Sequence, residues 1–315
     1  MVEWAQTLLH MESRPTRLKY RYRTNERTSM SLLPPIPNLT VAGGESLVWG
    51  RRTYVMGIIN VTPDSFSGDG LCGDLNAILR RAMEFQEAGA DFIDVGAEST
   101  RPGHQPLDAT DELERLLPAV ETLAGNIKIP ISVDTYKASV ARRTLEAGAT
   151  MINDVWGLKA DPDIAGAAAE AGVPLILMHN QKSTRYKDLL PDIFESLSES
   201  IQKALDAGVL QENIILDPGI GFGKTADHNL EILQRLNKFQ PISRPLLVGT
   251  SRKSTIGRIL DRPPHQRLEG TAATVALAIA GGADIVRVHD VPEMVRVCRM
   301  SDAIVRGWRP ASWTG

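Results

Sequence analysis

Polar side chains follow nearly every short apolar run in this sequence, and their types suit a ligand that carries phosphate groups. The acidic and amide residues in such positions are Asn60, Asp94, Asp134, Asn153 and Asp217, and the basic residues are Lys253, Arg287 and His289. A guanidinium group donates paired hydrogen bonds to phosphate oxygens, and histidine adds a group that can carry a proton. Together with Arg101 from an early loop, Arg287 and His289 therefore predict a phosphate or pyrophosphate substrate.

Some of these acidic and amide residues have a purely structural alternative. Asp and Asn at strand ends often cap the next helix or hold a turn. This role is favoured for Asp154 and Asn180. Asp134 precedes Thr135, which can cap the following helix equally well, so capping stays open while ligand binding is favoured. Asp94 is expected to belong to a buried hydrogen-bond network.

Asp217 begins the glycine-rich segment 217–225, which reads DPGIGFGKT. Three glycines in so short a segment predict that its backbone approaches something closely. The segment ends like a phosphate-binding loop, but Pro218 stands where that motif requires glycine. The third glycine of a dinucleotide-binding fingerprint would fall on Lys224. Both nucleotide-binding interpretations are therefore rejected.

Lys253 lies in the polar segment 251–254, just after a predicted strand. Barrel enzymes often bind phosphate or another anion at such a place. A Schiff-base lysine would need a desolvated pocket, which these polar neighbours do not suggest, and simple surface exposure is the remaining alternative. We favour a role in charge and hydrogen bonding. The loops 62–70, with Phe66, and 98–103 are predicted lids, with solvent-facing linkers as the alternative.

A recurring pattern defines the elements that must position these residues: a helical segment closes with a small residue and glycine, and an apolar run follows. The pattern occurs at 88–95, 147–152, 171–177, 207–216 and 281–286. Further apolar runs at 54–59, 131–133 and 246–248 bring the predicted strands to eight. Short apolar strands are typical of parallel sheets buried on both faces. Helical periodicity lies between them, for example at 75–88, 111–123, 138–146 and 292–305.

The spacing of the strands identifies the fold class. The ends of the first and eighth strands, Asn60 and Arg287, are 227 residues apart. The seven steps between them average about 32 residues, the size of one strand–helix unit. Eight such units predict an α/β fold, a (β/α)8 TIM barrel, with its active site at the carboxyl ends of the strands. An open doubly wound sheet is the alternative, but no G-x-G-x-x-G turn supports it.

Composition excludes several classes of protein. The chain is 43% hydrophobic and 23% charged, as folded globular proteins are. Its 35 Lys and Arg against 38 Asp and Glu give a net charge of -3, so no nucleic-acid partner is expected. No apolar run approaches the roughly 20 residues of a membrane span. Cys72 and Cys298 are too few for a disulfide framework, which favours the cytoplasm.

The first 37 residues differ from the rest of the chain. Residues 1–30 hold six Lys or Arg and three Glu, and a Pro-rich bridge, Leu32–Pro37, follows. We expect residues 1–37 to be a disordered extension and linker, or translation to start at Met30. Residues 38–315 are then expected to form a single catalytic domain.

The motifs at the strand ends resemble those of the dihydropteroate synthase family, from about Tyr54 to the carboxyl terminus. In chain order they are NVTPDSFS (60–67), ESTRPG (98–103), SVDT (132–135), ND (153–154), DPGIGFGK (217–224), SRKS (251–254) and RVHD (287–290). The resemblance implies condensation of 6-hydroxymethyl-7,8-dihydropterin pyrophosphate with 4-aminobenzoate to give dihydropteroate and pyrophosphate. It also implies Mg2+, a target of sulfonamides and a homodimer formed through the last helices.

The resemblance further implies roles for individual residues. Those that would hold the pterin are Asp134, Asn153, Asp217 and Lys253, with Met178 and Phe222 over its faces and Gly221 also substrate-binding. Those near 4-aminobenzoate would be Phe66, Pro102, Lys253 and Ser254, and Thr100 would also bind substrate. Asn60 would help to place Mg2+, while Arg101, Arg287 and His289 would bind the pyrophosphate as it leaves. The implied mechanism is dissociative, with Asp134 stabilising a cationic pterin methylene and no protein nucleophile.

Two segments depart from the usual family pattern. Residues 179–182 read HNQK where many members have Met-Arg-Gly after the histidine, and 68–70 read GDG rather than DGG. Neither contains a residue assigned above, so the departures leave loop detail and drug sensitivity open.

Two other functions remain as alternatives. Methyltetrahydrofolate methyltransferases share the pterin-binding barrel but bind no pyrophosphate, so the cationic residues favour the synthase. A non-catalytic paralogue would bind pterin pyrophosphate without releasing pyrophosphate.

Overall fold

The structure is a computed structural model of the chain, and it describes residues 38–40, 46–62, 70–71, 73–98 and 106–314. The chain divides into two compact units, 1–34 and 35–315, and all described residues lie in the second. The extension predicted for 1–37, most of the two predicted lids, and Phe66, Thr100, Arg101 and Pro102 lie outside the described residues.

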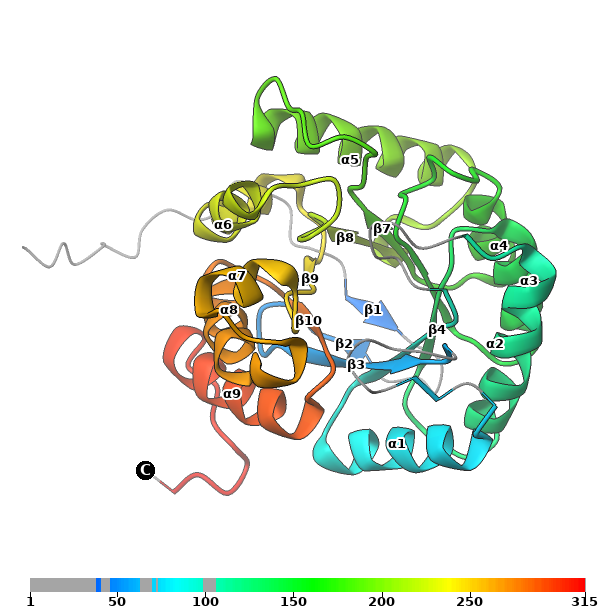
Figure 1. Cartoon of the computed structure of the whole chain (residues 1–315), viewed down its shortest axis with the longest axis horizontal. Helices are drawn as coiled ribbons and strands as arrows, with labels where there is room; N and C mark the ends of the chain where they lie inside the picture. Colours follow the sequence, from blue (N-terminus) through cyan, green and yellow to red (C-terminus); the bar gives the residue numbers. More distant parts are fainter. Residues whose placement is uncertain (1–37, 41–45, 63–69, 72, 99–105, 315) are drawn as a thin grey trace, which may run out of the picture. The chain divides into compact units, whose positions relative to one another are not determined.

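Eight parallel strands form a barrel, viewed nearly along its axis in Figure 1. They are β3 (Tyr54–Asn60), β4 (Phe92–Gly96), β5 (Ile131–Asp134), β6 (Met151–Asp154), β7 (Leu175–Met178), β8 (Ile214–Asp217), β9 (Leu247–Val248) and β10 (Ile285–Val288). Their order is β8-β7-β6-β5-β4-β3-β10-β9, and a parallel bridge between Leu216 and Leu246 joins the two ends. The predicted (β/α)8 barrel is therefore confirmed, and each predicted strand is present.

Helices surround the strands and cover their outer faces (Figure 1). They are α1 (Leu75–Ala88), α2 (Ala109–Ala124), α3 (Ala138–Glu146), α4 (Ile164–Ala171), α5 (Leu189–Asp206), α6 (Ala226–Gln234), α7 (Ser254–Leu260), α8 (Leu268–Ala280) and α9 (Val291–Val305), with short 3-10 helices η1 (Gln211–Asn213), η2 (Leu236–Ile242) and η3 (Pro264–Gln266). Glycines at all five recurring positions have positive φ: Gly89, Gly148, Gly172, Gly208 and Gly282. They end each helix before the next strand, as the sequence pattern predicted. None of the helices in this described part is long and apolar enough to cross a membrane.

The inside of the barrel changes from apolar to polar along the strands. A buried layer near the strand starts consists of Met56, Phe92, Met151, Ile176, Ile215, Leu247 and Ile285. Side chains two residues apart on a strand share a face. The next inward positions therefore include Asp94, Asn153, Asp217 and Arg287. The polar side chains at the strand ends therefore lie directly beside a buried apolar layer inside the barrel.

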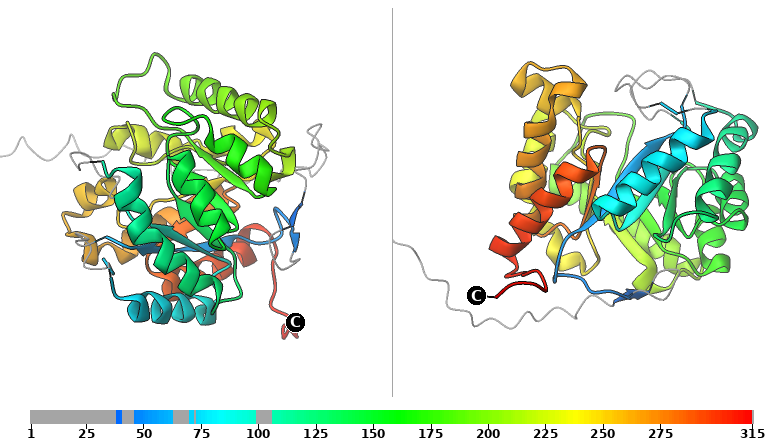
Figure 2. Two further views of the ribbon diagram at one scale, coloured as in Figure 1. Left: turned by 90° about the vertical axis from the view of Figure 1, so that its right-hand side faces the viewer. Right: turned by 90° about the horizontal axis from the view of Figure 1, so that it is seen from below.

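A small hairpin, missed in the sequence, closes the amino end of the barrel. Strands β1 (Leu39–Thr40) and β2 (Ser46–Leu47) pair antiparallel. Leu39 and Leu47 are buried in one cluster with Tyr54 and Phe92 of the apolar layer. Figure 2 shows the hairpin at the end of the barrel where the strands begin. The hairpin therefore keeps water from that end of the apolar layer.

Candidate functional site

Arg287 lies at the centre of a buried network that joins four strand ends. Its Nε donates to Asp94 Oδ2 at 2.5 Å, and its Nη2 donates to Asp134 Oδ2 at 2.9 Å. Asn153 Nδ2 also donates to Asp94 Oδ2, at 3.0 Å. Asp94 is fully buried, and among the described residues its Oδ1 accepts no hydrogen bond. The expected network role of Asp94 is confirmed, and β4, β5, β6 and β10 contribute to one polar layer.

Asp134 is placed in this layer with a strongly altered acidity. Burial raises its pKa to about 7, Arg287 opposes this rise, and the negative charge of Asp94 adds to it. The capping alternative for Asp134 is wrong, because Lys137 is the N-cap residue of α3 and the N–H of Ala138 in its first turn donates to Asp161 Oδ2 at 2.7 Å. Thr135 Oγ1 instead accepts from the Lys137 N–H at 3.3 Å. The Asp134 carboxylate therefore remains directed at the barrel interior.

Asp154, at the end of the neighbouring strand, has the structural role that was expected of it. Its carboxylate accepts the N–H groups of Trp156 and Leu158 at 2.8 and 2.6 Å and holds the turn after β6.

Asp217 begins a glycine loop, residues 217–224, that packs against the segment after β7. Asp217 Oδ1 accepts the Gly219 N–H at 2.6 Å, and burial raises its pKa. A Cβ at Gly219 would lie 1.9 Å from the carbonyl oxygen of His179, and one at Gly223 would lie 2.3 Å from that of Gln181. The close backbone approach predicted for this loop is confirmed, and its partner is another segment of the chain.

Lys253 reaches under the glycine loop from the start of α7. Its ammonium donates to the Ile220 carbonyl and lies 4.7 Å from the centre of the Phe222 ring. Burial lowers its pKa to about 8, and the carboxylate of Asp217 opposes that shift. A Cβ at Gly221 would lie 2.9 Å from Lys253 Cδ, so glycine leaves room for this side chain. The surface-lysine alternative is therefore wrong, while Ser254 is exposed at the helix start.

The loops after β9 and β10 are tied together beside Arg287. His289 Nδ1 lies 2.9 Å from Ser251 Oγ, which also accepts the His289 backbone N–H at 3.2 Å. Arg252 makes two hydrogen bonds to Asp290, at 3.0 and 2.5 Å. These contacts join the loop that leads to Lys253 to the loop that carries His289 at the carboxyl end of the barrel.

Asn60 and Met178 also lie at this end. Asn60 is half-buried at the end of β3, where it pairs with Gly96, and Met178 is buried at the end of β7. Within the described ranges no cluster of three His, Cys, Asp or Glu side chains is arranged to hold a metal. The Asn60 amide offers one neutral oxygen. A single neutral oxygen is enough for an Mg2+ ion whose other ligands are substrate phosphates and water, which is the usual way in which this ion is bound.

Sequence reasoning missed two half-buried lysines near these groups. Lys137 Nζ lies 2.6 Å from Glu98 Oε2 and 2.5 Å from Glu112 Oε2, which ties the end of β4 to α2 behind Asp134. Lys224 Nζ contacts His179. No local spacing reveals either set, because each contact joins segments far apart in the sequence. The position of Lys224 at the end of the glycine loop was the only available signal.

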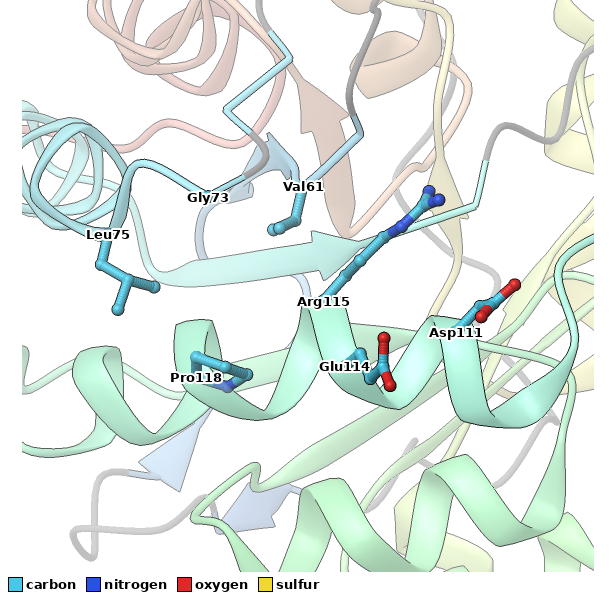
Figure 3. A pocket seen from close by; sticks show the side chains of 7 residues that line it. All are labelled: Val61, Gly73, Leu75, Asp111, Glu114, Arg115 and Pro118. Carbon is cyan, nitrogen blue, oxygen red and sulfur yellow. The ribbon is translucent and has the colours of Figure 1, made fainter.

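A separate pocket of about 480 Å³ lies between the end of β3 and helices α1 and α2. It is lined by Val61, Gly73, Leu75, Asp111, Glu114, Arg115 and Pro118, and Figure 3 shows Arg115 reaching from α2 towards the strand ends. Arg115 donates to the Ala97 carbonyl at 3.3 Å. None of the predicted site residues lines this pocket, so the polar layer is the candidate site.

Comparisons with known proteins agree with this geometry. Residues 56–289 match the family described as pterin binding enzyme. The chain is 50% identical over 260 residues to the dihydropteroate synthase of Bacillus subtilis, covering 82% of this chain and 91% of that protein. It also resembles a Clostridium difficile dihydropteroate synthase crystallised in the presence of pteroic acid, with TM-score 0.79, 48% identity and coverage of 82% and 99%. A Xanthomonas albilineans dihydropteroate synthase with 4-aminobenzoic acid gives TM-score 0.80, 38% identity and coverage of 87% and 99%.

We expect Gly219→Ala to destabilise the protein more than Gly172→Ala. Both glycines have positive φ, +74° and +67°, but a Cβ at Gly172 meets nothing within 4 Å. The control should lose about 1 kcal/mol of unfolding free energy from backbone strain, and Gly219→Ala about 1–3 kcal/mol more from the clash with His179. Urea unfolding measures both, and equal losses would show that the loop does not depend on this close approach.

Proposed function

The chain belongs to the pterin-binding enzyme family and, within it, to the dihydropteroate synthases, and from this premise we propose how its residues carry out the reaction. The enzyme joins 6-hydroxymethyl-7,8-dihydropterin pyrophosphate to 4-aminobenzoate and forms dihydropteroate and pyrophosphate. One observation carries the assignment of residues: two carboxylates, an amide and a guanidinium group from separate strand ends meet in a single polar layer.

The pterin is proposed to lie across this layer against the glycine loop. A pterin edge presents several N–H donors and ring acceptors, which require carboxylates and an amide in a dry pocket. Asp134, Asn153 and Asp217 supply these groups from β5, β6 and β8. Lys253 supplies a donor, while Met178 and the Phe222 ring supply apolar surface for the pterin faces, with Gly221 giving the loop room.

The pyrophosphate is proposed to leave towards Arg287 and His289. Their charge and hydrogen bonds stabilise negative charge that grows on the departing oxygen. Arg101, which lies outside the described residues, is proposed to assist from the loop after β4. Asn60 would hold Mg2+ together with the pyrophosphate, and the ion would neutralise charge on the phosphate oxygens.

The chemistry requires no protein nucleophile. The bond between the pterin methylene carbon and the pyrophosphate oxygen breaks first, and its electron pair leaves with pyrophosphate. The buried Asp134 carboxylate stabilises the cation that results. The amine of 4-aminobenzoate, held near Ser254, Phe66 and Pro102, then attacks the carbon and loses one proton to solvent.

The first experiment measures pyrophosphate release by the full chain, given pterin pyrophosphate and Mg2+, with and without 4-aminobenzoate. We expect release to be coupled to dihydropteroate, which is detected directly. Tight pterin binding without release would indicate the non-catalytic paralogue. Transfer of a methyl group from methyltetrahydrofolate would indicate the methyltransferase.

We expect Asp134→Asn to lower kcat by about 100-fold to 1,000-fold, the usual effect of removing one charge-stabilising group. The KM for 4-aminobenzoate should change little, because Asp134 acts on the cation. Since Asp134 is ionised only above a pKa of about 7, wild-type kcat/KM should fall as pH decreases through that value. The variant should lack this dependence.

Asp154→Asn is the matched control for this variant. It alters a buried carboxylate at the neighbouring strand end that only holds a turn. Its kcat should stay within about threefold of wild type, below the effect of one lost catalytic group. Equal kcat losses in the two variants would contradict the role of Asp134.

We also propose a cytoplasmic homodimer formed through α8 and α9. Leu277 on α8 and Met300 and Ile304 on α9 are 64%, 62% and 72% exposed, and these two helices pack side by side. A contiguous exposed apolar face commonly marks an interface. The unpaired, buried Cys298 suits a reducing compartment.

Sedimentation velocity tests the dimer. We expect wild type and Leu210→Lys, a control at an exposed leucine before η1, to sediment as dimers, and Ile304→Lys as a monomer. A monomeric wild type would exclude the proposed assembly.

A further inference from the structure

Lys224 ends the glycine loop, where it is half-buried, and the mechanism above gives it no role. Its Nζ lies 2.9 Å from His179 Nδ1, 2.9 Å from the Phe222 carbonyl oxygen and 3.4 Å from the His179 carbonyl oxygen. An ammonium group has three N–H donors and no acceptor. Lys224 therefore uses its donors on two segments at once, the glycine loop and the start of the segment after β7.

The surroundings of Lys224 are set by charges from several elements. Burial lowers its pKa to about 7, the Asp217 carboxylate opposes this shift, and Lys253 and Lys159 add to it. Burial, together with the charges of Lys224 and Lys159, lowers the pKa of His179 to about 2, so its ring is neutral. A neutral ring has one nitrogen that accepts, and the ammonium form of Lys224, which predominates below its pKa, can only donate. When Lys224 is protonated, the contact is therefore a hydrogen bond from lysine to histidine.

Two lysines hold the glycine loop through alternate carbonyl groups. Lys253 donates to the Ile220 carbonyl, and Lys224 donates to that of Phe222. Between these two anchors, the Phe222 ring lies 4.7 Å from Lys253 Nζ. A shift of the Phe222 carbonyl would therefore move both the ring and the main-chain acceptor of Lys253.

We propose that Lys224 is a positioning residue for pterin binding: through His179 and the Phe222 carbonyl it fixes the glycine loop, and so the Phe222 ring and the Lys253 amine. The proposal rests on the pterin position given above. It differs from a catalytic role because Lys224 acts on the loop and touches no reacting atom.

Lys224→Met tests this role because methionine fills similar space without a donor. Removing a charged hydrogen bond of this kind should weaken pterin binding about 10-fold to 100-fold. We expect this loss in the affinity for 6-hydroxymethylpterin, followed by its own fluorescence, and in the KM for pterin pyrophosphate. The KM for 4-aminobenzoate should stay near the wild-type value. Lys224→Arg, which keeps the donors and the charge, should recover part of the affinity.

Lys159→Met is the matched control. Lys159 Nζ donates to the Asn180 carbonyl at 2.9 Å, so it holds the segment after β7 without contacting the glycine loop. We expect its pterin affinity to be close to that of wild type. Equal losses in Lys159→Met and Lys224→Met, or wild-type affinity in Lys224→Met, would overturn the proposal.

A replacement variant and a binding assay without turnover keep the test decisive. If the methionine variant does not fold, Lys224→Gln, which retains an N–H donor group, takes its place with the same expected direction and a smaller loss. Pterin binding is measured without turnover, so absence of dihydropteroate from wild type would reject the proposed function, while the binding comparison would still decide the role of Lys224.

Discussion

The pairing of the partly buried Arg287 with two carboxylates is the constraint on which the rest of the site depends. A lone ion in a protein interior costs several kcal/mol, and pairing offsets this cost only when the geometry is good. Asp94 and Asp134 supply that geometry from β4 and β5, across the barrel interior from β10. The positions of these strands therefore depend on the ion pairs of the layer. Moving a strand would break an ion pair, and removing one charge would leave its partner unpaired.

The apolar layer beneath these charges makes them effective. Phe92 lies two residues before Asp94 on the same face of β4, and the hairpin residues Leu39 and Leu47 complete the closed end of the barrel. In such dry surroundings the interaction between charges is stronger than in water. The same surroundings raise the pKa of Asp134 and lower that of Lys253, so the pKa values of both groups lie near neutral pH. Apolar packing at the amino end of the barrel thus contributes to the pKa shifts of Asp134 and Lys253 at the carboxyl end.

The glycine loop brings a second group of buried charges to this layer. Its backbone lies directly on the carbonyl groups after β7, where a side chain at Gly219 would not fit. Lys224 and Lys253 then hold the loop from two sides. Three loops, after β7, β8 and β9, therefore together define one wall of the proposed pterin site, although the sequence separates them widely.

The sequence alone determined the barrel, because its signals are local: apolar runs, helical periodicity and glycines that end helices. It also placed polar residues at the strand ends, since each directly follows its strand. Only the tertiary structure decided which of these residues meet. Arg287 and Asp94 are 193 residues apart, and Lys224 and His179 are 45 apart, so their contacts follow from closure of the barrel and packing of its loops. The hairpin β1–β2 was missed for a similar reason: its two-residue strands carry no periodic pattern, and their burial depends on the barrel that they close.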